Sequence, residues 1–241
     1  MFHAVVFVAG VVAAAIAAVA GFGIGSLLTP VFAVRLGTRL AVAAVAIPHF
    51  AGTLQRFFVL RHHVDRRVLL GFGAASAVGG LTGALLHARV PNRPLTLVFG
   101  ALLVLAALSE LTGWMQRVRW GRGAAWVAGA LSGLLGGLVG NQGGIRSASM
   151  LGFEVPKESF VATATAVGVI VDIARLPVYL ATDGQALLRY WPLILAATAG
   201  AVIGTPLGIR VLARVPERVF RRIVAVLLLV LGVAMIVSGG R

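Results

Sequence analysis

Long apolar stretches, parted by short segments that carry arginine, dominate the pattern of hydrophobic and polar positions along this chain. A hydrocarbon core of about 30 Å needs roughly 20 apolar residues in an α-helix, and six uninterrupted stretches are that long. They predict spans over Val42–Leu60, Val68–His87, Leu95–Trp114, Ser159–Leu180, Trp191–Val211 and Val219–Val237. Two further stretches, Val5–Val34 and Ala124–Leu151, are broken in the middle by glycine clusters. The pattern therefore predicts an all-α polytopic membrane protein.

The second half of the sequence repeats the first. An offset of 119 residues aligns Gly21 with Gly140, Gly25 with Gly144, and Arg56 with Arg175. An offset of 125 residues aligns Gly79 with Gly204, Gly83 with Gly208, and residues 88–93 (ARVPNR) with 213–218 (ARVPER). One six-residue gap near Asp183 and Gln185 reconciles the two offsets. The match predicts a first membrane repeat over 1–114, a basic connecting loop over 115–122, and a second membrane repeat over 123–241.

The course of the two glycine-broken stretches decides how the repeats are related. If each stretch crosses once, both halves have four spans and run parallel, and the Lys and Arg residues outside the spans divide ten against eight between the two sides. If each stretch dips in and returns as a hairpin, the halves have three further spans and are inverted, and the division is twelve against six. The second division fits the positive-inside rule better. The sequence favours inverted repeats, although hydropathy leaves both courses open.

Composition agrees with a membrane protein and excludes several functions. The 241 residues are 59% hydrophobic and 12% charged, with a mean hydropathy of +1.00. The net charge of +14 comes from arginines placed mostly between the apolar stretches, where they meet anionic lipid head groups, so no nucleic-acid partner is expected. Cysteine is absent, and Asp172 is the only carboxylate deep in a predicted span. No nucleophile with its base, no metal cluster and no cofactor is therefore expected, and an enzyme is disfavoured.

The two glycine clusters are the candidate substrate site. Broken helices at membrane depth are tolerated where their backbone is buried in protein or lines a cavity, and transporters often bind substrate there. A helix that begins after such a break directs its first N–H groups and its positive dipole end into the cavity, which suits an anion. The candidate binding residues are Gly23, Gly25, Asn141, Gln142, Gly143, Gly144 and Arg146. The alternative is that the glycines only allow close helix packing.

Five ionisable residues within the predicted helices are further candidates, because burying charge in a membrane is costly. Arg146 is expected to pair with an oxyanion, or else to cap backbone carbonyls or reach the head groups. Arg56 and Arg175 occupy equivalent repeat positions, either as gating residues or as side chains that reach for the head groups. Asp172 lies one turn before Arg175, as its ion-pair partner or as a proton acceptor for coupled transport. His49 could also carry protons, or only pack.

Three motifs resemble the sulfite exporter TauE/SafE family of permeases over nearly the whole chain. They are GFGIGSLLTP at 21–30, GLLGGLVGNQGGIRSASMLGF at 133–153 and FVATATAVGVIVD at 160–172. The resemblance implies a secondary permease of the cell membrane for sulfite, organosulfonates or related small anions. The chain has Asn141 and Gln142 where the family pattern has more glycine, and substrates vary across the family. The particular anion therefore stays open.

Taken together, these features predict a secondary transporter with an anion site near the midplane, alternating access by rocking of the halves, and protons as a candidate coupling ion. The partners expected are the lipid bilayer and a small anionic substrate. A carrier of a different small carboxylate or anion and a membrane assembly subunit are the alternatives, and the oligomeric state is open, a homodimer included.

Overall fold

The computed structural model describes residues 1–20, 22–114, 122–141, 143, 146, 150, 156–211 and 217–239, and every element in this part of the chain is a helix. The first half contains α1 (Phe2–Ala20), α2 (Ile24–Leu60), η1 (Arg61–His63), α3 (Arg66–Val68), the π-helical η2 (Leu69–Gly73), α4 (Ala74–His87) and α5 (Asn92–Thr112). The second half contains α7 (Arg122–Val139), α9 (Lys157–Arg189), α10 (Trp191–Val211) and α11 (Glu217–Gly239). The all-α prediction is confirmed.

Seven helices in the described ranges are long and apolar enough to cross a membrane, and α3, η2 and α4 together make one of them, Arg66–His87. A shorter apolar helix, Trp126–Val139, precedes the second glycine cluster. Large apolar side chains are exposed on α5, α10 and α11, as expected where the surroundings are lipid tails. The prediction of a polytopic helical membrane protein is confirmed.

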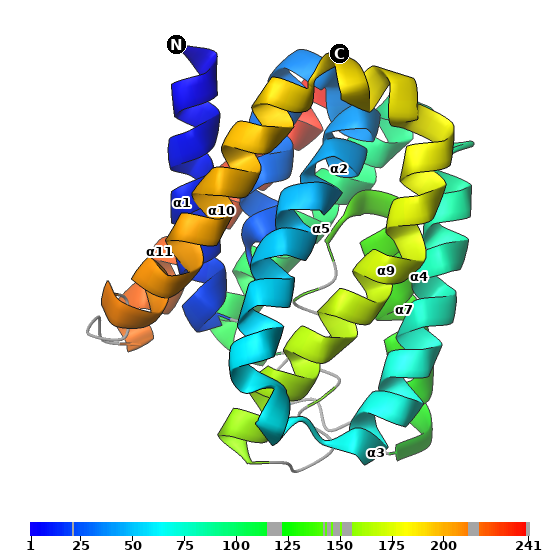
Figure 1. Cartoon of the computed structure of the whole chain (residues 1–241), viewed down its shortest axis with the longest axis vertical. Helices are drawn as coiled ribbons and strands as arrows, with labels where there is room; N and C mark the ends of the chain where they lie inside the picture. Colours follow the sequence, from blue (N-terminus) through cyan, green and yellow to red (C-terminus); the bar gives the residue numbers. More distant parts are fainter. Residues whose placement is uncertain are drawn as a thin grey trace.

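The helix α2 differs from its prediction, because it joins the end of the first glycine-broken stretch to the next span. The chain starts α2 at Ile24 and bends it at Gly37, whose φ of 73° lies in the left-handed region that glycine adopts without strain. In Figure 1, α1 runs away from the end that holds the N-terminus, and the first part of α2 returns toward it. The second part of α2 then crosses the molecule.

The span predicted over Ser159–Leu180 is too short, since α9 continues to Arg189. The polar residues Thr182 and Asp183 follow the predicted end but stay helical. In the structure Asp183 is an ion-pair partner of Arg39, with 3.6 Å between Oδ1 and Nη2, so the helix continues with its carboxylate paired. The two chain termini lie at this same end of the bundle (Figure 1).

The helices pack mostly across the two halves: α1 against α10, α4 against α7, α5 against α11, and α2 against α9. Small residues let these helices approach closely. A Cβ atom at Gly204 of α10 would collide with the backbone oxygen of Val11 in α1, and one at Gly79 of α4 would collide with that of Ala130 in α7. Such contacts replace the hydrophobic effect as the source of helix association in lipid.

Candidate functional site

The two glycine breaks touch each other in the middle of the bundle. Gly25, in the first turn of α2, lies so close to the backbone oxygen of Gly140 that a Cβ atom would collide with it. Gly143 packs in the same way against the Cβ atom of Phe22. The breaks are 115 residues or more apart in sequence, and only side-chain-free positions permit this approach.

A polar contact joins the same two segments. The hydroxyl of Ser26 donates a hydrogen bond of 3.3 Å to Oδ1 of Asn141, and both residues are buried. Sequence analysis did not select Ser26 as a binding residue; its place one residue after Gly25 was the available signal. Gln142 and Gly144, two of the predicted binding residues, lie outside the described residues.

Backbone conformation explains two of the glycines. Gly23 has a φ of 140° and precedes the first residue of α2, and Gly140 has a φ of 73° and follows the last residue of α7. Residues with a side chain are strained at these φ angles. Glycine therefore lets α7 end at Gly140 and α2 begin after Gly23 without strain. Because Gly23 has no side chain, the first turn of α2 receives no side-chain cap. Its N–H groups are available to another acceptor.

A fully buried carboxylate lies beside the breaks. Asp172 of α9 is 0% exposed. Its Oδ2 accepts a hydrogen bond of 2.7 Å from Nδ1 of His49 in α2, and its Oδ1 accepts one of 2.9 Å from Nε of Arg175. The second nitrogen of the guanidinium, Nη2, is 2.7 Å from the same Oδ1. Sequence analysis expected the Asp172–Arg175 pair and is confirmed there, but it did not connect His49 to this carboxylate.

Arg56 and Arg175 hold the carboxyl ends of the two helices that precede the breaks. Nη1 of Arg175 donates a hydrogen bond of 2.6 Å to the carbonyl oxygen of Gly136 in the last turn of α7. Nη1 of Arg56 donates to the carbonyl oxygen of Ala17 in the last turn of α1. A cation there compensates the unpaired carbonyls and the negative end of the helix dipole. The offset of 119 residues relates both arginines and both carbonyls.

Neither arginine reaches for the head groups. Arg56 is 5% exposed and Arg175 is 1% exposed. The alternative that their side chains snorkel to the surface is wrong for the conformation described here, because each guanidinium finds a stronger acceptor inside the protein, at a helix end.

Two residues that sequence analysis missed complete the carboxyl end of α7. The hydroxyl of Tyr179 donates to the carbonyl oxygen of Gly137, and Nδ1 of His87 donates to that of Leu138 over 2.7 Å. Tyr179 lies one turn beyond Arg175 on α9, which was the available signal. Three successive carbonyls at the end of α7 are thus satisfied by side chains from α9 and α4.

Arg146 lies beyond the second break and is 3% exposed. A Cβ atom at Gly168 of α9 would be 3.0 Å from its Nη1. Its charge interacts electrostatically with Arg56, His49 and Asp172, so all four belong to one charged cluster. In the described part of the chain, the buried side chains with full charge are Arg56, Arg146, Arg175 and Asp172. With Arg175 included, the described members of this cluster carry three positive charges and one negative charge, before any proton on His49.

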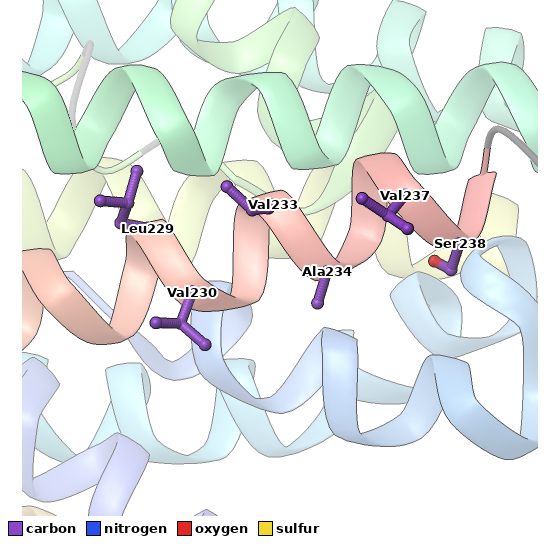
Figure 2. A pocket seen from close by; sticks show the side chains of 6 residues that line it. All are labelled: Leu229, Val230, Val233, Ala234, Val237 and Ser238. Atoms are coloured by element: carbon purple, nitrogen blue, oxygen red, sulfur yellow. The ribbon is translucent and has the colours of Figure 1, made fainter.

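An apolar groove lies elsewhere on the protein. Leu229, Val230, Val233, Ala234, Val237 and Ser238 line it along one face of α11 (Figure 2). None of these residues belongs to the charged cluster, and Val230 is 61% exposed. A lipid chain satisfies such a surface, so the groove is no candidate for the anion.

A bundle of lipid-facing helices with two broken helices and a buried cationic centre defines a polytopic membrane protein of the transporter class. The family model described as Sulfite exporter TauE/SafE matches residues 6–235, and the chain belongs to this family. No curated protein and no solved structure matches the chain. Members of the family are membrane transporters for sulfite and related anions rather than enzymes, so this chain is a multi-pass transporter of the cell membrane. The resemblance expected from the motifs is confirmed.

Proposed function

We propose that the protein is a secondary permease for a small oxyanion, sulfite or an organosulfonate, which binds where the two glycine breaks meet. One observation carries this proposal: in the described part of the chain, three buried arginines, Arg56, Arg146 and Arg175, lie beside the broken helices together with one buried carboxylate, Asp172. Net positive charge in a low-dielectric interior is costly, so an excess of cations among the described residues favours an anionic ligand. The first-turn N–H groups of α2 add donors from the backbone.

The binding residues proposed are those of the two breaks and Arg146. Gly23 and Gly25 come from the first break, and Asn141 and Gly143 come from the second, which packs against it. Gln142 and Gly144 belong to the proposal on sequence grounds alone. Arginine suits the role because its planar fork of donors matches two oxygens of a sulfite or sulfonate group.

Paired contacts support a two-fold relation between the halves, 1–114 and 123–241, joined by the basic loop 115–122. Glycines of α10 pack on backbone oxygens of α1, and the aligned glycines of α4 pack on the aligned oxygens of α7. The matched pairs are Gly204 on Val11 with Gly79 on Ala130, and Gly208 on Ala15 with Gly83 on Leu134. A two-fold axis between intertwined repeats produces this exchange of partners.

Contacts at the two ends of the bundle support inversion. Phe2, at the start of α1, packs against Arg35, with 4.0 Å between the guanidinium carbon and the ring centroid. Trp126, near the start of α7, packs against Gly71 at the other end. These contacts support equivalent helices that start at opposite ends, as inverted repeats with one glycine-broken hairpin and three spans each require. Rocking of one repeat against the other then alternates access.

Sidedness in the membrane tests the hairpins, and the absence of cysteine makes single-cysteine variants clean probes. We expect cysteines at the exposed positions His63 and Glu158 to react with an impermeant maleimide from the same side of the membrane, and one at Arg89 from the opposite side. The backbone N–H of Asp65 donates to Oγ1 of Thr163 over 2.9 Å, which supports that placement. Single crossings of both broken stretches would put His63 and Glu158 on opposite sides.

Proton coupling is proposed through Asp172 and His49. Their hydrogen bond joins the two halves, so loss or gain of a proton there changes the contact that holds the halves together. The charged and titratable groups around it among the described residues are Arg175 and Tyr179 on α9 and Arg146 beyond the second break, and Arg56 on α2 interacts with Arg146. Arg56 and Arg175 are proposed as the gating residues, because each holds the end of one broken helix.

Anion binding tests the function directly. We expect sulfite and methanesulfonate, but not acetate, to raise the thermal unfolding temperature of the purified protein, since a ligand at 100 times its Kd stabilises by about 2.7 kcal/mol. Sulfate, a larger dianion, tests whether negative charge alone raises the unfolding temperature. Arg146→Gln should lose the shift, and Arg189→Gln, at the exposed end of α9, should keep it. No shift with any of these anions, or an equal shift in Arg146→Gln, would contradict the proposal.

A further inference from the structure

The two halves place an arginine in the same way but give it different partners. Arg56 and Arg175 each bind the carbonyl at the aligned position of a broken helix, Ala17 and Gly136. The residue one turn earlier is Asp172 in the second half and Thr53 in the first, again at the offset of 119 residues. Because both arginines anchor one end of the guanidinium alike, the other end points to aligned places.

In the second half that place is filled by a carboxylate. Nε of Arg175 donates to Oδ1 of Asp172 over 2.9 Å. In the first half, Nε of Arg56 is buried and has no hydrogen-bond partner among the described residues, and the same holds for Oγ1 of Thr53. Arg56 is 5% exposed and Thr53 is 2% exposed. Two buried polar atoms one turn apart on α2 thus lack the acceptor that Asp172 supplies on α9.

The histidine that binds Asp172 also has no equivalent in the other half. Asp172 accepts its second hydrogen bond from His49, and the residue aligned with His49 is Gly168. A Cβ atom at Gly168 would lie 3.0 Å from Nη1 of Arg146 and 3.2 Å from Cγ2 of Thr53. Glycine at this position lets α9 pack closely against Thr53, and a second guanidinium, that of Arg146, lies against the same glycine. Arg146 also interacts electrostatically with Arg56.

Resting on the proposed function, we propose that the transported anion binds in the first half at the position that the Asp172 carboxylate occupies in the second. Nε of Arg56 and the hydroxyl of Thr53 donate to its oxygens, and Arg146 supplies the second positive charge. Gly168 limits the ligand to a small head group. A sulfite or sulfonate group offers the charge and the two or more terminal oxygens that this arrangement accepts. Arg56 and Thr53 are thereby specificity-determining residues.

A carboxylate built into the chain tests this placement. Thr53→Asp should weaken methanesulfonate binding to the purified full-length protein by at least about 30-fold, because the new carboxylate pairs with Arg56 as Asp172 pairs with Arg175. Thr53→Val keeps the size of threonine without the hydroxyl donor and should weaken binding only about threefold. Thr182→Asp adds the same charge at an exposed position of α9 and should leave the Kd unchanged. Without ligand, Thr53→Asp should unfold at or above the wild-type temperature.

Two results would overturn the placement while the proposed function stands. One is a wild-type Kd in Thr53→Asp, and the other is equal loss in Thr53→Val and Thr53→Asp. If Thr53→Asp does not fold, Arg56→Lys decides: it keeps the charge but lacks the Nε donor, so binding should weaken about tenfold, and an unchanged Kd would refute the placement. A wild-type protein that binds neither methanesulfonate nor sulfite would instead remove the proposed function itself.

Discussion

Asp172→Asn is expected to destabilise the protein by about 3–5 kcal/mol, because it leaves Arg175 buried beside a neutral side chain and removes the charged acceptor of His49. Unfolding in a detergent series, followed by circular dichroism or by tryptophan fluorescence, measures the loss. In proteoliposomes the same variant is expected to lose the response of sulfite flux to an imposed pH gradient.

The matched control is Asp183→Asn, which breaks the ion pair with Arg39. The side chains of that pair are 36% and 14% exposed, so its removal should cost about 1 kcal/mol or less. Equal stability losses in the two variants would contradict the special role of the buried pair. A flux that still responds to the pH gradient in Asp172→Asn would show that Asp172 is not the coupling residue.

Valine at Gly204 or at Gly79 is expected to destabilise the bundle by more than about 3 kcal/mol, above the usual range for overpacking, because the new Cβ meets a backbone oxygen that cannot move aside. The two positions are aligned in the halves and make aligned contacts. The two losses should therefore be similar, and the folded fraction in mild detergent, measured by size-exclusion chromatography, should fall in both.

Gly184→Val is the control for this pair. Gly184 lies near the end of α9, and a Cβ atom there has no neighbour within 4 Å among the described residues. This variant should remain folded. Tolerance of valine at Gly204 together with intolerance at Gly79 would argue against the two-fold relation that the contacts support.

The sequence predicted the spanning helices because an apolar helix of the right length is a local signal that lipid enforces. Two helices differ from their predicted spans, one for a local reason and one because of a distant contact. Gly37 turns the chain inside α2 without ending its apolar pattern, and Asp183 stays in α9 because Arg39, 144 residues earlier, pairs with it. The ion pair of Asp183 with Arg39 is a contact between the two halves, which hydropathy does not encode.

The site was predicted in part, and for similar reasons. Glycine clusters at aligned positions identified both breaks, and the spacing of Asp172 and Arg175 identified their pair. The contact of Gly25 with Gly140 and the hydrogen bond from His49 to Asp172 join residues more than 100 positions apart, so no periodicity predicts them. The carbonyls that bind Arg56 and Arg175 belong to helix ends that exist only because the helices are broken.

Counterflow of radiolabelled sulfite into proteoliposomes preloaded with unlabelled sulfite tests the central claim most directly. The account predicts uptake well above that of empty liposomes, competition by methanesulfonate, loss in Arg146→Gln, and retention in Arg189→Gln. Uptake no faster than in empty liposomes, or full uptake by Arg146→Gln, would contradict a sulfite or sulfonate permease whose site lies where the two broken helices meet.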